Sequence, residues 1–192
     1  MIITFSPRLN YDFCLRSAYS KNRNARKAEN RETLPNRSLV IADSDAVKKI
    51  SEKLRNLEYS SDNSKEVLQT TKAFVEIYNN LVDSSGKSEE TSIATLKKQL
   101  SKMTKSEKEE LASIGIEIKS NGQLKLDVET FGKSRPAKIE KILSGDCTFA
   151  KSVRSFANKI HKLANRQPSA YTPDGSSTSK SAAAGSTVDV SL

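Results

Sequence analysis

The sequence predicts a mainly α-helical domain, a helical bundle with an antiparallel helix pair and one small β-hairpin. Apolar residues recur at spacings of three and four over most of residues 41–166, which is the period of one helix face. A clear two-residue period occurs in only one place, around Asn121 and Gly122. Trp is absent and hydrophobic residues make up 35% of the chain. The core must therefore consist mainly of Leu, Ile and Val, and part of the chain must lie outside it.

Composition and charge divide the 192 residues into three regions. Residues 1–40 carry 8 Lys and Arg against 3 Asp and Glu with little apolar periodicity, so we predict a basic, largely flexible arm. Residues 41–166 form the predicted helical domain. Residues 167–192 are rich in Ser and Ala and have no apolar period, which is typical of a disordered tail.

Three helices are predicted in the first half of the domain. Asp43 or Ser44 is the expected N-cap of the first helix, and polar breaks at 60–64 and 83–88 separate the three. Their apolar stripes are Val47, Ile50, Leu54 and Leu57; Val67, Thr71, Phe74, Tyr78 and Leu81; and Ile93, Leu96, Leu100 and Met103.

A hairpin is predicted at residues 116–126. A two-residue loop would put its two apolar pairs on opposite faces. A three-residue loop at 120–122 pairs Ile118 with Leu124 and Ile116 with Leu126, so that all four share one face. Gly122 would then supply the positive φ that such loops use. We therefore predict the three-residue loop, with the hairpin lying on the helices.

Short helices are predicted on both sides of the hairpin. Thr104 and Glu107 fit a capping box for a helix that stops near residue 114, where Gly115 suits a left-handed position. Asp127 can cap a second short helix. Pro136 fits the first turn of a third helix, which Gly145 ends. The residues of this third helix that we expect to be buried are Ile139, Ile142 and Leu143.

The last helix combines an apolar stripe with a basic surface. Its stripe, a candidate face for a partner helix, is Phe149, Val153, Phe156, Ile160 and Leu163. Its basic residues are Lys151, Arg154, Lys159, Lys162 and Arg166. Because the stripe has the same spacing as the helix around Phe74, we expect these two helices to pack as antiparallel neighbours.

The residues give little indication of catalysis. His161 is the single histidine, and it has no carboxylate three or four positions away to orient it, so we interpret it as a half-exposed surface residue. Cys14 and Cys147 lie far apart, which excludes a disulfide scaffold and a Cys/His zinc site. There is no glycine-rich phosphate loop and no apolar run that could span a membrane. We predict a non-enzyme without cofactors.

Nucleic-acid binding is the alternative function that the charge raises. The arm interleaves Arg8 and Arg16 with aromatic residues, and the last helix carries a second basic surface. The aromatic residues of the arm are Phe5, Tyr11, Phe13 and Tyr19. No known nucleic-acid-binding module matches the sequence, so nucleic acid is not the favoured partner.

Several short motifs follow one another in residues 62–165. Residues 74–81 read Phe-Val-Glu-Ile-Tyr-Asn-Asn-Leu, residues 111–116 read Leu-Ala-Ser-Ile-Gly-Ile, and residues 122–127 read Gly-Gln-Leu-Lys-Leu-Asp. The motif residues are Phe74, Val75, Tyr78, Asn79, Leu81, Gly115, Ile116, Gly122, Leu124, Leu126 and Asp127. This ordered set resembles the bacterial flagellar filament-cap family (hook-associated protein, type 2).

The resemblance implies the inner, helical domain of a cap subunit. Proteins of that family leave the cell through the flagellar export apparatus, form rings at the filament tip and promote flagellin assembly. The expected partners are therefore flagellin, cap or hook-associated subunits and further copies of this chain. The expected location is the flagellum or the extracellular space. A cytoplasmic accessory of flagellar assembly is the alternative.

Overall fold

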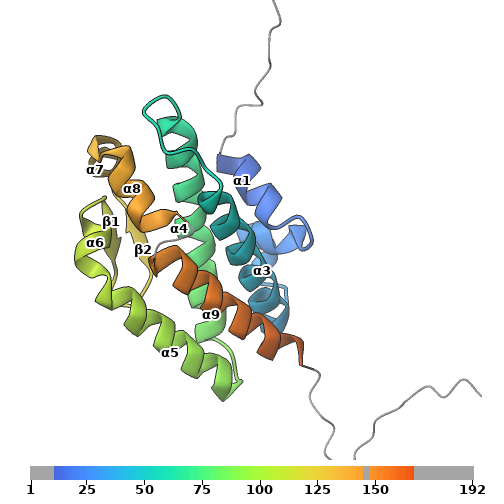
Figure 1. Cartoon of the computed structure of the whole chain (residues 1–192). Coiled ribbons are helices and arrows are strands. Elements are labelled where there is room, and N and C mark those ends of the chain that lie inside the picture. The colour runs from blue at the N-terminus through green and yellow to red at the C-terminus, as the bar shows by residue number, and fades with distance from the viewer. Residues whose placement is uncertain (1–10, 145–147, 167–192) are drawn as a thin grey trace, which may run out of the picture.

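Helices α3 and α4 form the centre of the molecule, and the other elements pack around them (Figure 1). The structure is a computed structural model that describes residues 11–144 and 148–166. In chain order the elements are α1 (Tyr11–Ala18), the 3-10 helix η1 (Arg23–Arg26), α2 (Ala28–Arg31), α3 (Asn36–Arg55), α4 (Ser64–Gly86), α5 (Thr91–Ser106), α6 (Lys108–Ala112), β1 (Ile116–Ile118), β2 (Leu124–Leu126), α7 (Val128–Lys133), α8 (Pro136–Leu143) and α9 (Thr148–Asn165). The predicted fold class, mainly α with one hairpin, is confirmed.

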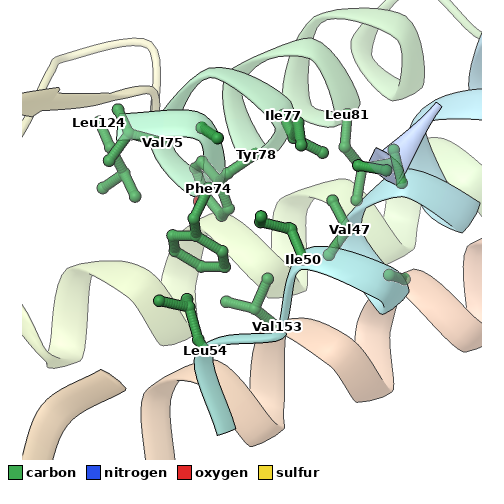
Figure 2. Packing of buried hydrophobic residues seen from close by; sticks show 14 of the residues in the cluster. Val47, Ile50, Leu54, Phe74, Val75, Ile77, Tyr78, Leu81, Leu124 and Val153 are labelled. Atoms are coloured by element: carbon green, nitrogen blue, oxygen red, sulfur yellow. The ribbon is translucent and has the colours of Figure 1, made fainter. Parts of the chain in front are cut away.

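The hydrophobic core lies where α3, α4 and α9 meet. Figure 2 shows Val47, Ile50 and Leu54 of α3 packed near Phe74 of α4 and Val153 of α9. All five are at most 1% exposed. Full burial of one such side chain contributes about 1.5–3 kcal/mol. This region is therefore a main source of stability, and it holds the three longest helices together.

The main packing partner of α9 is α3. We expected α9 to pack along α4, but direct contact between these two helices centres on the rings of Phe74 and Phe149, which meet edge to face with centroids 6.1 Å apart. The reason is that α3 has more than one buried face. Besides the predicted stripe, it buries small and polar residues, namely Ala42, Asp43, Ser44, Ala46 and Ser51. Helices can therefore pack on two sides of α3.

Residues 11–40 are folded onto the domain, so the prediction of a largely flexible arm was wrong for this part. Cys14 and Ala18 are buried four residues apart, as are Leu15 and Tyr19, which is the spacing of one helix face. Helix α1 packs against α4 and α3 (Figure 1). Ala25 in η1 is also buried. The predicted domain boundary at residue 41 is therefore incorrect.

Helix α3 begins at Asn36, so neither Asp43 nor Ser44 is its N-cap. Both residues are buried in the middle of the helix, where Asp43 pairs with Arg31 and Ser44 contacts His161. A polar side chain in a helix usually lies at a cap or faces solvent, unless tertiary partners satisfy it. Here the partners come from α2 and α9, which the local sequence does not reveal.

The predicted capping box at Thr104 does not form. Helix α5 continues to Ser106, and α6 begins after Glu107, which makes no side-chain cap hydrogen bond. The Thr104 hydroxyl is buried and donates to the Leu100 carbonyl at 2.9 Å, and it also contacts the Tyr78 hydroxyl. Thr104, which was predicted to be a cap, instead makes a tertiary contact with Tyr78.

The hairpin has the predicted register. Ile116 pairs with Leu126 and Ile118 with Leu124, and Gly122 has φ +86°. On the opposite face, the Lys125 amine lies 3.2 Å from a carboxylate oxygen of Glu117.

Apart from the capping box, the predicted features of the short helices that fall on described residues are found. Gly115 has φ +79°, and the Asp127 carboxylate accepts hydrogen bonds from the backbone N–H groups of Glu129 and Thr130. Pro136 is in the first turn of α8. The residues of α8 predicted to be buried, Ile139, Ile142 and Leu143, are buried.

Some predictions fall outside the described residues. These are the tail at 167–192, the helix end at Gly145, Cys147, and the first ten residues with Phe5 and Arg8.

Candidate functional site

The junction between α4 and the hairpin contains most of the motif residues. Tyr78 lies at its centre, with a side chain that is 0% exposed. Its hydroxyl donates to the Gly122 carbonyl at 3.2 Å and lies 2.9 Å from the Thr104 hydroxyl. One side chain of α4 therefore joins the hairpin loop to α5.

Asn79 pairs with the outer edge of β2 as a neighbouring strand would. Its amide nitrogen donates to the Leu124 carbonyl at 2.9 Å, and its amide oxygen accepts from the Leu124 N–H at 2.7 Å. A two-stranded hairpin is marginal on its own. The side chain of Asn79 thus satisfies the outward N–H and carbonyl groups of Leu124, which would otherwise face solvent or pair with another strand.

The remaining motif residues support the same junction. Phe74 and Leu81 are buried in the core beneath it, and Ile116 is buried at the start of β1. The Gly115 carbonyl accepts from the Asp127 N–H at 2.8 Å, which joins the end of α6 to the start of α7. Val75 is 8% exposed, and Leu126 is half-buried beside a hollow. Most of the motif residues therefore contribute hydrogen bonds or packing to the junction, while Phe74 and Leu81 belong to the core.

Alkaline pH is expected to destabilise the fold through Tyr78. Burial raises the pKa of Tyr78 from 10.0 to about 12. Below pH 10 the phenol is neutral in both states, so its contribution to stability is complete. Between pH 10 and 12 the phenol ionises in the unfolded chain first. The free energy of unfolding then falls by about 1.4 kcal/mol per pH unit for this residue.

Urea unfolding of the wild type and Tyr78→Phe on both sides of pH 10 measures this effect. The variant is expected to be less stable near neutral pH, because it leaves the Gly122 carbonyl and Thr104 hydroxyl without this partner. It is also expected to lose less stability than the wild type above pH 10. Equal losses in the two proteins would contradict the assignment. Tyr19, whose pKa burial also raises, is present in both.

A buried ion pair joins α2 to α3. The guanidinium of Arg31 donates to both carboxylate oxygens of Asp43 at 2.8 Å, and Tyr19 donates its hydroxyl hydrogen to the same carboxylate at 2.8 Å. Asn80 of α4 donates to the Tyr19 hydroxyl at 3.1 Å. Arg31 also donates to the Ala25 carbonyl at 2.8 Å. The network thus fixes the segment 19–31 to the central helices, and sequence reasoning missed it.

His161 connects α9 to α3 and is more buried than we predicted. Its side chain is 20% exposed, and its Nδ1 lies 3.2 Å from the Ser44 hydroxyl and 3.4 Å from an Asp45 carboxylate oxygen. Both partners approach the same ring nitrogen, and Ser44 donates to the Ile41 carbonyl. A catalytic triad needs its serine and carboxylate at opposite ring nitrogens. The cluster is therefore a helix contact.

The basic residues of α9 spread over an outward surface. Lys151, Lys159 and Lys162 are exposed, as is Arg166 directly after the helix, and a guanidinium nitrogen of Arg154 lies 3.7 Å from a Glu52 carboxylate oxygen. The apolar stripe of α9 faces inward, with Phe149, Val153 and Ile160 buried and Phe156 half-buried. Since this stripe is occupied by the core of the same chain, little of it is left for a partner helix.

Neither a group of metal-ligating side chains nor a membrane-spanning helix is found in the described residues. Across 11–144 and 148–166, no three His, Cys, Asp or Glu residues are grouped so that they could hold a metal. In the same ranges, no helix has both the length and the apolar character needed to cross a bilayer. Cys14 is buried, with its sulfur 3.7 Å from the Thr70 hydroxyl oxygen.

Comparison with known proteins returns nothing similar. No protein-family model, no curated protein and no solved structure matches this chain.

Proposed function

We propose that this chain is a non-enzymatic structural or assembly protein of the bacterial flagellum, whose domain resembles the inner domain of the filament cap. In this role it acts by binding other flagellar subunits and promoting flagellin assembly. Its partners are flagellin, cap or hook-associated subunits, and further copies of itself. It reaches the flagellum by flagellar export, or it acts as a cytoplasmic accessory of assembly.

One observation carries the proposal. The first motif, at 74–81, lies 30 or more residues from the other two, at 111–116 and 122–127, yet its Tyr78 and Asn79 bind the backbone of the third. Gly115 of the second accepts the N–H of Asp127 in the third. The residues that carry the resemblance thus meet at one junction between α4 and the hairpin, and this shared location supports the proposal.

Sedimentation velocity on the purified full chain, alone and with purified flagellin from the source organism, tests this function. We expect self-association or a complex with flagellin that survives moderate salt. The salt matters because a net charge of +9 attracts acidic proteins non-specifically. A chain that stays monomeric and sediments independently of flagellin would contradict the proposal.

A further inference from the structure

A concave, strongly basic surface lies on the segment that precedes α3. It consists of two adjoining hollows of about 500 and 620 Å³, which share Ser20, Arg23 and Asn24. We call it the basic concavity, and its charged residues are Arg16, Lys21, Arg23, Arg26 and Lys27. Residues 16–28 contain no Asp or Glu. Positive charge is therefore concentrated on the segment 16–28.

Part of this charge has no partner within the domain. Asp12 pairs with Arg16 at 3.0 Å and with Arg26, and Lys27 lies 3.7 Å from Glu29. In the described ranges, the exposed side chains of Lys21 and Arg23 make no hydrogen bond or ion pair, and neither hollow is lined by a carboxylate. Two cations thus remain free to bind an anion.

Buried residues and hydrogen bonds fix the backbone of the basic concavity. Tyr19 is 2% exposed at its edge, and Ala25 is buried beneath its centre. Arg31 binds the Ala25 carbonyl, and the Lys49 amine donates to the Ser20 hydroxyl at 2.7 Å. The charged side chains therefore extend from a folded backbone, which lowers the entropy cost of binding.

We propose that the basic concavity binds the phosphate backbone of single-stranded nucleic acid. Arg and Lys beside hydroxyl and amide donors, such as those of Ser20 and Asn24, are the groups that contact phosphate oxygens. Hollows of this volume accept a nucleotide-sized group. Because the ring of Tyr19 is buried, we expect the contacts to be made with phosphates, which carry no sequence information, so binding is independent of sequence.

Two other partners fit the surface less well. An acidic protein would need apolar or aromatic anchors, which usually carry protein interfaces. A membrane would need an exposed apolar side chain that can insert. Neither hollow is lined by the exposed large apolar residues Phe13 and Val128, and the ring centre of Phe13 lies 5.7 Å from the Lys53 amine.

Fluorescence anisotropy of the full chain with a labelled oligothymidylate of about 20 nucleotides tests the proposal. The matched variants are K21E/R23E in the concavity and K151E/K162E on α9, which change the net charge equally. We expect K21E/R23E to weaken binding about tenfold or more and to lower the salt slope by about 1.4, as two lost phosphate contacts require. K151E/K162E should bind nearly as the wild type does.

Three results would overturn the proposal. The first is binding that is absent or insensitive to salt between about 50 and 200 mM. The second is an equal loss in the two variants, which would mean that net charge alone drives binding. The third is tighter binding of a polyglutamate peptide or a phosphatidylglycerol vesicle than of the oligonucleotide, if K21E/R23E also weakens that binding. None of these results bears on the flagellar proposal, which depends on the hairpin junction.

Discussion

Replacing Gly115 by Ala is expected to lower the free energy of unfolding by about 2–5 kcal/mol. Gly115 has φ +79°, which costs an L-residue energy. A Cβ added there would lie 2.8 Å from the Asp127 carbonyl oxygen and 2.9 Å from the Phe131 nitrogen. Both are backbone atoms, so the clash cannot be relieved by rotating a side chain. The turn that joins α6 to β1 and α7 would have to move.

Gly132→Ala is the matched control for this prediction. Gly132 lies in α7, and an added Cβ there meets nothing within 4 Å. Ala is favoured over Gly in a helix by about 1 kcal/mol, so this variant should be as stable as the wild type or slightly more stable. Urea unfolding monitored by circular dichroism compares the two. A Gly115→Ala protein that matches Gly132→Ala would show that the turn is not constrained as the structure has it.

Asp43→Ala is expected to destabilise the fold by about 3–5 kcal/mol, because it leaves a mostly buried guanidinium unpaired. The Arg31 side chain is 14% exposed and Asp43 is 0% exposed. Asp12→Ala removes a carboxylate that also pairs with arginine, but Asp12 is 51% exposed. An exposed pair contributes about 0–1 kcal/mol, so this control should lose little.

A double variant separates the charge from the packing at this site. Replacing both partners, as in Arg31→Met with Asp43→Leu, removes the unpaired charge and should recover part of the loss of Asp43→Ala. Chemical unfolding of the wild type, Asp43→Ala, Asp12→Ala and the double variant at neutral pH measures these differences in the free energy of unfolding. If Asp43→Ala costs no more than Asp12→Ala, the pair is not buried in solution as it is in the structure.

Local patterns predicted the elements whose causes are local. The register of the hairpin followed from the alternation of Ile116, Ile118, Leu124 and Leu126, and its loop from Gly122. The cap at Asp127 lies within three residues of the N–H groups that it binds. In these cases the residues that predict the feature lie within one short window of the sequence.

Contacts between distant residues could not be predicted from local patterns. The arm at 11–40 appeared flexible because its charges mask the buried spacing of Leu15 and Tyr19. Asp43 precedes an apolar stripe and was therefore predicted to be an N-cap. Its actual partner, Arg31, lies on another element, and no local pattern indicates that pairing. At the junction, the motif at 74–81 included Tyr78 and Asn79. The spacing of its residues did not predict which backbone groups these side chains would bind.

The proposed function requires that the protein belong to the flagellum. An antibody against the chain, applied to cytoplasm, culture supernatant and sheared flagella of the source cells, measures this most directly. We predict a signal in sheared flagella or in the supernatant, where an exported subunit would be found. A signal confined to the cytoplasm would contradict assignment to the filament cap.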